Sequence, residues 1–169
     1  YVKQDAGDYK DGNGDRVSPT AYDHLRRQFK LSGRFDNHDM ALSFEDLEDP
    51  GTYYERPHMI NFAGRFILSD HQLHRRTATY THRYDPASEW IDVEATLFRT
   101  TSDFKVRRNS TGLLYAQGEQ DSVGLDLRNT ARMSKLDLVW GLDFREDTLE
   151  ALQQATPPAF WGSTRQRAR

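Results

Sequence analysis

The chain has 169 residues, of which 36% are hydrophobic and 29% are charged, with a net charge of -3 and no cysteine. The lack of cysteine excludes a disulfide scaffold, a thiolate metal site and cysteine catalysis, and the small negative charge gives no reason to expect nucleic acid as a partner. No run of residues approaches the ~20 consecutive apolar residues of a membrane helix, whereas a membrane β-strand needs an apolar residue only at every second position.

Six segments alternate between apolar and polar residues with a period of two, which predicts β-strands. In chain order these segments are 28–35, 40–45, 77–84, 91–98, 123–132 and 136–145. The last segment shows the pattern clearly, because its apolar side chains fall on one face, at Leu136, Leu138, Trp140, Leu142 and Phe144. We therefore predict an all-β fold, an antiparallel up-and-down meander of six to eight strands.

The connections between these strands differ in length. Short turns rich in Asp, Asn, Pro and Ser join the strands in pairs, at 36–39, 85–89 and 133–135. Longer polar stretches separate or flank the pairs, at 4–22, 46–71, 101–121 and 146–169. Short turns at one end of the sheet and long loops at the other are typical of a bacterial outer-membrane barrel.

Alternation by itself does not distinguish a membrane barrel from a soluble β-sandwich, which buries its apolar face under a second sheet. Strand length favours the barrel, because each segment can reach the roughly 9–11 residues of a tilted membrane strand. Aromatic residues that could form part of an interfacial girdle are Tyr80, Tyr84, Trp90 and Trp140.

The segment 122–148, SVGLDLRNTARMSKLDLVWGLDFREDT, resembles a barrel hairpin of TonB-dependent outer-membrane receptors. The segments 7–23, GDYKDGNGDRVSPTAYD, and 25–45, LRRQFKLSGRFDNHDMALSFE, resemble a loop and a preceding hairpin of the same family. The resemblance implies that residues 1–169 are an internal piece of a larger transmembrane barrel. This piece has no plug domain and no barrel C-terminus, and its first and last strands have open edges.

The resemblance also implies a function in the outer membrane, namely energy-coupled uptake of a ferric siderophore or haem. The expected partners are this iron chelate, outer-membrane lipid and, through the missing plug, an inner-membrane energy-coupling protein. We expect no bound cofactor. Two alternatives remain open: a soluble β-sandwich that binds a ligand such as carbohydrate, and a non-specific porin-type barrel.

Aromatic and cationic side chains in the long polar stretches are the candidate ligand-binding residues. Arginine and tyrosine suit an anionic, aromatic catecholate through hydrogen bonds and stacking, and histidine or tyrosine suits haem iron. The candidates are Tyr53, Tyr54, Arg56, His58, Arg107, Arg108, Phe160 and Trp161.

The sequence predicts neither a catalytic site nor a metal site. It contains no nucleophile elbow, phosphate-binding loop, zinc-protease motif or dinucleotide fingerprint, so we expect no enzyme. The Asp and Gly residues at 11–15 resemble the start of a calcium loop, but Arg16 and Tyr22 stand where that loop needs Gly and Glu. His71 and His74 have a helical metal-ligand spacing in a segment that predicts the entrance to a strand.

Overall fold

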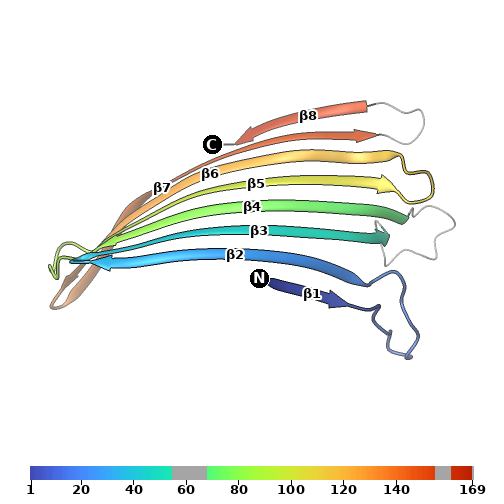
Figure 1. Ribbon diagram of the computed structural model, residues 1–169. Helices are drawn as coiled ribbons and strands as arrows, with labels where there is room; N and C mark the ends of the chain where they lie inside the picture. Colours follow the sequence, from blue (N-terminus) through green and yellow to red (C-terminus); the bar gives the residue numbers. More distant parts are fainter. Residues whose placement is uncertain (55–67, 155–160, 169) are drawn as a thin grey trace.

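The computed structural model describes residues 1–54, 68–154 and 161–168, and for 153, 154 and 161–168 it describes the backbone alone. These residues form one antiparallel eight-stranded sheet in which the strands follow chain order (Figure 1). The strands are β1 Val2–Ala6, β2 Tyr22–Phe35, β3 His38–Tyr54, β4 Leu68–Tyr84, β5 Val93–Arg108, β6 Leu114–Met133, β7 Leu136–Gln154 and β8 Trp161–Ala168. The predicted all-β meander is confirmed.

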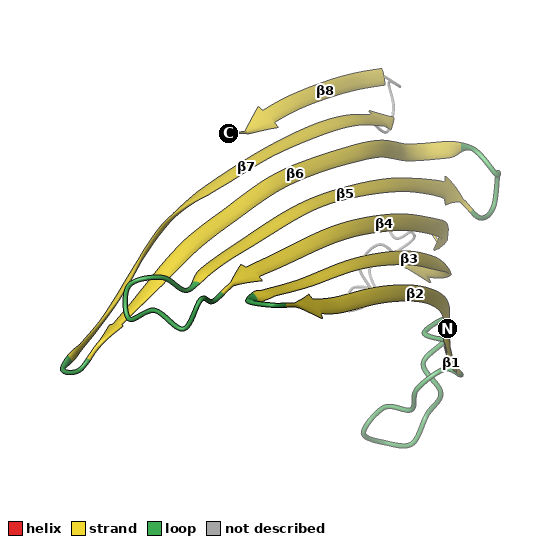
Figure 2. Ribbon diagram, turned by 60° about the vertical axis from the view of Figure 1, so that its left-hand side comes forward, coloured by secondary structure: helices red, strands yellow, loops and turns green. Residues whose placement is uncertain are grey.

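The sheet is a single bowed layer, with β1 at one edge and β8 at the other (Figure 2). Every neighbouring pair from β1–β2 to β7–β8 is antiparallel. Within the described ranges no second sheet packs on either face, and no helix is long and apolar enough to cross a bilayer. The second layer that a β-sandwich requires is therefore not found in this part of the chain.

The strands are longer than the sequence predicted. The stretches 46–71 and 101–121 were predicted as loops, but β3 continues to Tyr54, β4 begins at Leu68, and β5 and β6 fill most of the second stretch. The pairing continues there through polar residues, for example Asp46 opposite Arg76 and Arg76 opposite Thr101. The two-residue period continues there, but at Leu47, Leu73 and Phe104 the apolar residues lie on the other face of the sheet.

The connections lie at two ends of the sheet, which we name by them. The turn end holds 36–37, 85–92 and 134–135, and the loop end holds 7–21 and 109–113. At the turn end Asp36 adopts a left-handed φ of 50°. The predicted alternation of short turns and long loops is wrong in one place, because the loop-end connection 109–113 is shorter than the turn-end connection 85–92.

The connection 7–21 is held by two aspartates. The carboxylate of Asp8 accepts hydrogen bonds from the backbone amides of Thr20 at 2.6 Å and Ala21 at 2.7 Å, and the first of these bonds contributes most to keeping the pKa of Asp8 well below its ordinary value. The carboxylate of Asp11 accepts from the amides of Asn13 and Asp15, both at 2.9 Å. The Asp and Gly residues of 11–15 thus form a turn whose first carboxylate binds backbone amides.

Glycines on β6 make room for aromatic rings of β5. Gly118 lies opposite Phe104, and a Cβ atom at Gly118 would lie 2.5 Å from the Phe104 ring. Gly124 lies opposite Phe98 and is in contact with its ring in the same way. Both rings therefore lie against the sheet.

Candidate functional site

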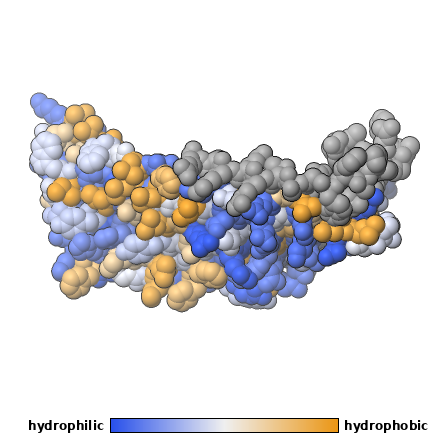
Figure 3. All heavy atoms as spheres, turned by 90° about the horizontal axis from the view of Figure 1, so that it is seen from above, coloured by the Kyte–Doolittle hydropathy of each residue, from blue (hydrophilic) through white to orange (hydrophobic). Residues whose placement is uncertain are grey.

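One face of the sheet is apolar over the half nearest the turn end, and we call it the apolar face. The register places the apolar residues of neighbouring strands opposite one another. One complete row consists of Leu31, Leu42, Tyr80, Leu97, Leu125 and Phe144. Figure 3 shows hydrophobic residues gathered in the left-hand half of the molecule, toward the turn end.

The large side chains of the apolar face are exposed although they lie in a regular sheet. Leu31 is 62% exposed, Trp140 61% and Leu142 55%. By contrast, Ala131 is the single hydrophobic residue that is fully buried among the described residues. A chain of this length that leaves its largest apolar face uncovered needs an apolar environment or a partner against that face.

Aromatic residues border the apolar face at the turn end. The row that runs across the sheet there consists of Phe35, His38, Tyr84, Val93, Asn129 and Trp140. The rings of His38 and Tyr84 are stacked, with centroids 4.6 Å apart. Of the four residues predicted for an aromatic girdle, Tyr84 and Trp140 thus lie in one row, while Tyr80 lies farther from the turn end and Trp90 lies in the connection 85–92.

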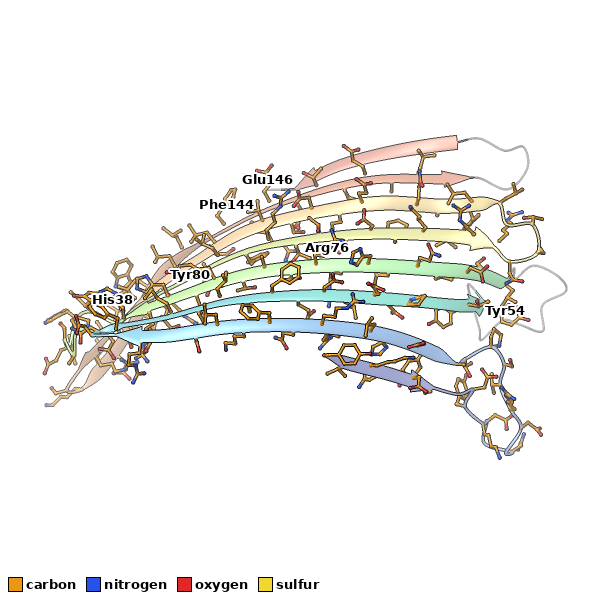
Figure 4. The ribbon with its side chains drawn as sticks, viewed as in Figure 1. His38, Tyr54, Arg76, Tyr80, Phe144 and Glu146 are labelled. Carbon is orange, nitrogen blue, oxygen red and sulfur yellow. The ribbon has the colours of Figure 1, made fainter. Side chains whose placement is uncertain are left out.

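Charged residues border the apolar face on its other side. Along β7, Phe144 is the last apolar residue of this face and Glu146 is the next residue on it (Figure 4). The adjoining row consists of Arg27, Asp46, Arg76, Thr101, Asp121 and Thr148. On β2 to β5 the apolar face is therefore bounded by an aromatic row and a charged row, whereas on β7 it continues past the aromatic row to Leu136.

In the charged part, Asp46, Glu48 and His74 bring their ligand atoms within 4.8 Å of one another. A guanidinium nitrogen of Arg27 lies 2.7 Å from Glu48 and 3.8 Å from Asp46, and His74 lies 3.0 Å from Asp46. These carboxylates are thus neutralised by side chains of the protein. His71 lies on the opposite face of β4, so His71 and His74 do not form a common site.

The other face carries charged and hydroxyl residues over the same half of the sheet, and we call it the polar face. A row of alternating charge crosses it next to the turn end, consisting of Arg34, Asp39, Arg83, Glu94 and Arg128. Arg34 donates to Asp39 at 2.5 and 3.0 Å, and Arg128 lies 2.7 Å from Glu94. A groove of about 690 Å³ lies over this row.

Asp92 ties the connection 85–92 to the sheet. It was predicted inside a strand beside Glu94, but it precedes β5 and its side chain is only 4% exposed. Its carboxylate accepts hydrogen bonds from Arg83 at 2.7 and 2.9 Å and from Arg132 at 2.5 Å. The bonds from Arg83 are the main reason that the pKa of Asp92 falls to about 2, against the opposing effect of burial.

At the loop end, the polar face brings two of the predicted ligand residues together. Tyr53, Ser69 and Arg108 follow one another across β3, β4 and β5. The ring of Tyr53 lies 5.6 Å from that of His71, and the guanidinium of Arg108 lies 5.6 Å from the ring centroid of Tyr115. Burial raises the pKa of the Tyr53 phenol, so the phenol is a neutral hydrogen-bond donor at neutral pH.

The other predicted ligand residues do not join this group. Tyr54 and Arg107 lie on the opposite side of the sheet from Tyr53 and Arg108, because neighbours along a strand point to opposite faces. Arg56, His58 and Phe160 lie outside the described residues, and Trp161 begins β8 with only its backbone described. The prediction of loops is therefore wrong for Tyr53 and Tyr54, which lie in β3, and for Arg107 and Arg108, which lie in β5.

The sequence analysis missed an apolar patch on the polar face, between the charged row and Tyr53. The patch consists of Leu47, Leu73, Phe104, Val106, Leu149 and Ala151. A groove of about 1010 Å³ at the same level lies on the other side of the sheet, because its flanking side chains, such as Glu48, His74 and Glu150, lie on the same face as Asp46 and Arg76. Continuing the two-residue period of β3–β5 past the predicted strand ends would have revealed the apolar patch.

From Leu97 to Arg108 along β5, most side chains on the apolar side are exposed, and those on the polar side are half-buried. This difference, together with the groove over the row from Arg34 to Arg128, indicates that the polar face is the hollow one. No protein-family model and no curated protein matches the chain.

Proposed function

We propose that this chain forms part of the wall of an outer-membrane β-barrel receptor that takes up an iron chelate, a ferric siderophore or haem. The observation that carries the proposal is the exposed apolar band on the convex side of a single sheet. In a barrel of this kind the convex face contacts lipid, and the hollow face lines the passage. Energy coupling from the inner membrane would then drive transport.

The dimensions of the apolar band fit a bilayer. On β7 the band runs from Leu136 to Phe144, which at ~3.3 Å per residue is about 26 Å along the strand. A tilted strand converts this into roughly 20 Å of depth, close to the ~25 Å apolar band of outer-membrane barrels. The charged row matches one interface of such a band, whereas on β7 the aromatic row crosses the band at Trp140, midway between Leu136 and Phe144.

The hollow face supplies the chemistry expected of the ligand side. Tyr53 offers a hydrogen-bond donor and a ring, Arg108 supplies a cation, and the patch that contains Leu73 and Phe104 offers apolar contact. A ferric catecholate presents negative charge and aromatic rings, and haem presents a flat apolar macrocycle with carboxylates. Both chelates therefore match a surface of this composition.

Spin labels along β7 test the lipid-facing assignment. The chain has no cysteine, so single cysteines at positions 136–149 can each be labelled without background. In lipid vesicles we expect the oxygen accessibility of the label to alternate with a period of two, high at Leu138 and Leu142 and low at Gly141 and Asp143, because oxygen concentrates in lipid. Beyond Glu146 the alternation should cease.

The same labels in detergent-free buffer provide the control. If labels at Leu138 and Asp143 are equally accessible to a water-soluble nickel complex in vesicles, the apolar face does not contact lipid and the membrane proposal fails.

Two matched pairs of variants test ligand binding at the loop end. We expect Arg108→Ala and Tyr53→Ala to weaken binding of a ferric catecholate or haem about tenfold each, because each removes one desolvated contact of about 1.4 kcal/mol. Arg107→Ala and Tyr54→Ala change the same residue types on the opposite face and should leave affinity within about twofold. Quenching of intrinsic fluorescence by the chelate measures the affinity of the refolded full chain.

Equal losses in both members of each pair would contradict the assignment of the hollow face as the ligand side. Binding of neither chelate by the unmodified chain would contradict the proposed ligand class while leaving the spin-label result intact.

A further inference from the structure

Two histidines of the apolar face lie in contact near the turn end. His38 at the start of β3 and His82 near the end of β4 place Nδ1 and Nε2 at 2.9 Å from each other. Their rings are stacked with centroids 5.1 Å apart, and the ring of Tyr84 covers the other side of His38. The strand register and the stacking thus fix both imidazoles.

The distance between the two nitrogens is that of adjacent ligands in a square-planar metal complex. Nitrogen ligands ~2.05 Å from one ion and at a right angle to each other are about 2.9 Å apart, whereas tetrahedral ligands are about 3.3 Å apart. Among common divalent ions, Cu²⁺ and Ni²⁺ take tetragonal geometry with imidazole, while Zn²⁺ takes the tetrahedral one. In the structure the same distance is that of a hydrogen bond between the two rings, so an ion that binds both nitrogens takes the place of the shared proton.

Met40 adds a thioether beside the imidazoles. It lies directly opposite His82 in the register and two residues from His38 on the same face of β3, so the three side chains form a triangle. A thioether is a weak axial ligand for copper. The combination of two imidazoles and one thioether therefore favours copper over nickel.

The neighbours of this triangle leave it open. In the same row, Gly33 lies opposite Met40 and Ala95 lies opposite His82. A Cβ atom at Gly33 would meet nothing within 4 Å, so there is room beside Met40 for a further ligand of the ion. The nearby arginines Arg34 and Arg83 lie on the polar face, so neither shares the face of the triangle.

We propose that His38, His82 and Met40 form a copper-binding site, with the two imidazoles as equatorial ligands and the thioether as the axial ligand. His38 lies in the aromatic row, and Met40 and His82 lie in the row of Leu142, on the face opposite the patch proposed to contact the iron chelate. The copper site is independent of the proposed transport function.

Titration of the refolded full chain with Cu²⁺ in detergent micelles, against a competing chelator, tests the site. We expect one tight equivalent whose electron paramagnetic resonance spectrum shows coupling to two imidazole nitrogens. His82→Phe keeps an aromatic ring for the stack but removes a ligand, and should weaken Cu²⁺ binding at least about tenfold. Met40→Leu should change the affinity less, because an axial ligand is weakly bound.

His74→Ala is the matched control, because it removes the imidazole next to Asp46 and Glu48 and should leave the tight site intact. His82→Gln provides a second ligand deletion should the phenylalanine variant fold poorly, and a circular dichroism spectrum typical of β-sheet checks both. A spectrum of the unmodified chain with one nitrogen or none would overturn the proposal. So would Cu²⁺ affinity that is lost in His74→Ala but kept in His82→Phe.

Discussion

Leu142→Arg is expected to lower the free energy of unfolding of the chain in a bilayer by about 2–4 kcal/mol, which is the cost of an arginine near the middle of the lipid-facing side of a membrane barrel. Leu142 lies within the apolar band on β7, beside Trp140 and Phe144, and is 55% exposed. In water, a substitution at so exposed a position would change stability by no more than about 0.5 kcal/mol. The size of the effect therefore reports whether lipid covers this face. Urea titration of the chain folded into lipid vesicles, followed by tryptophan fluorescence, measures it.

A pair of neighbouring residues gives the matched control for Leu142→Arg. Leu138 and Val139 are adjacent on β7, at the same depth but on opposite faces, and are 48% and 60% exposed. Leu138→Arg should destabilise the folded chain about as much as Leu142→Arg, because each lies two residues inside one end of the band from Leu136 to Phe144. Val139→Arg should have little effect. Equal effects of Leu138→Arg and Val139→Arg would show that the two faces share one environment, which a barrel wall excludes.

The part of the fold that sequence predicted best is the apolar band. Leu31, Leu42 and Phe144 were assigned to the faces on which the register places them, because burial in lipid or in a core imposes the same two-residue period. Toward the loop end the apolar residues change faces, as at Phe104 and Val106, and the predicted strands were not continued across that change. The strand ends at Tyr54 and Arg108 were missed for that reason.

The candidate site was predicted less well, for a related reason. Tyr53 with Tyr54, and Arg107 with Arg108, were predicted to lie in loops, where nothing in the sequence assigns neighbouring side chains to different faces. On a strand, adjacent residues point to opposite faces, so only one member of each pair can contribute to the hollow face. The His38–His82 contact depends on the register between β3 and β4, which the hydropathy pattern of either strand alone does not give.

Asp92→Ala is expected to lower the free energy of unfolding by about 2–3 kcal/mol, because it leaves Arg83 and Arg132 without the carboxylate that both bind. The loss is smaller than the ~3–5 kcal/mol of a fully buried pair, since the side chains of these arginines are 38% and 55% exposed. Glu89→Ala removes an exposed carboxylate from the same connection and should change stability by less than about 0.5 kcal/mol.

The pH dependence of stability isolates the charge of Asp92 from its packing. The pKa of Asp92 in the folded chain is lowered to about 2, below the ~3.9 of an unfolded aspartate. A depressed folded pKa means that the carboxylate stabilises the fold above about pH 4 and that this contribution is lost as the pH falls from 4 toward 2. Asp92→Asn keeps the shape of the side chain but cannot titrate, so its stability should fall less over that range. A wild-type chain and an Asp92→Asn variant with parallel pH profiles would show that the two arginines do not hold the connection through this carboxylate.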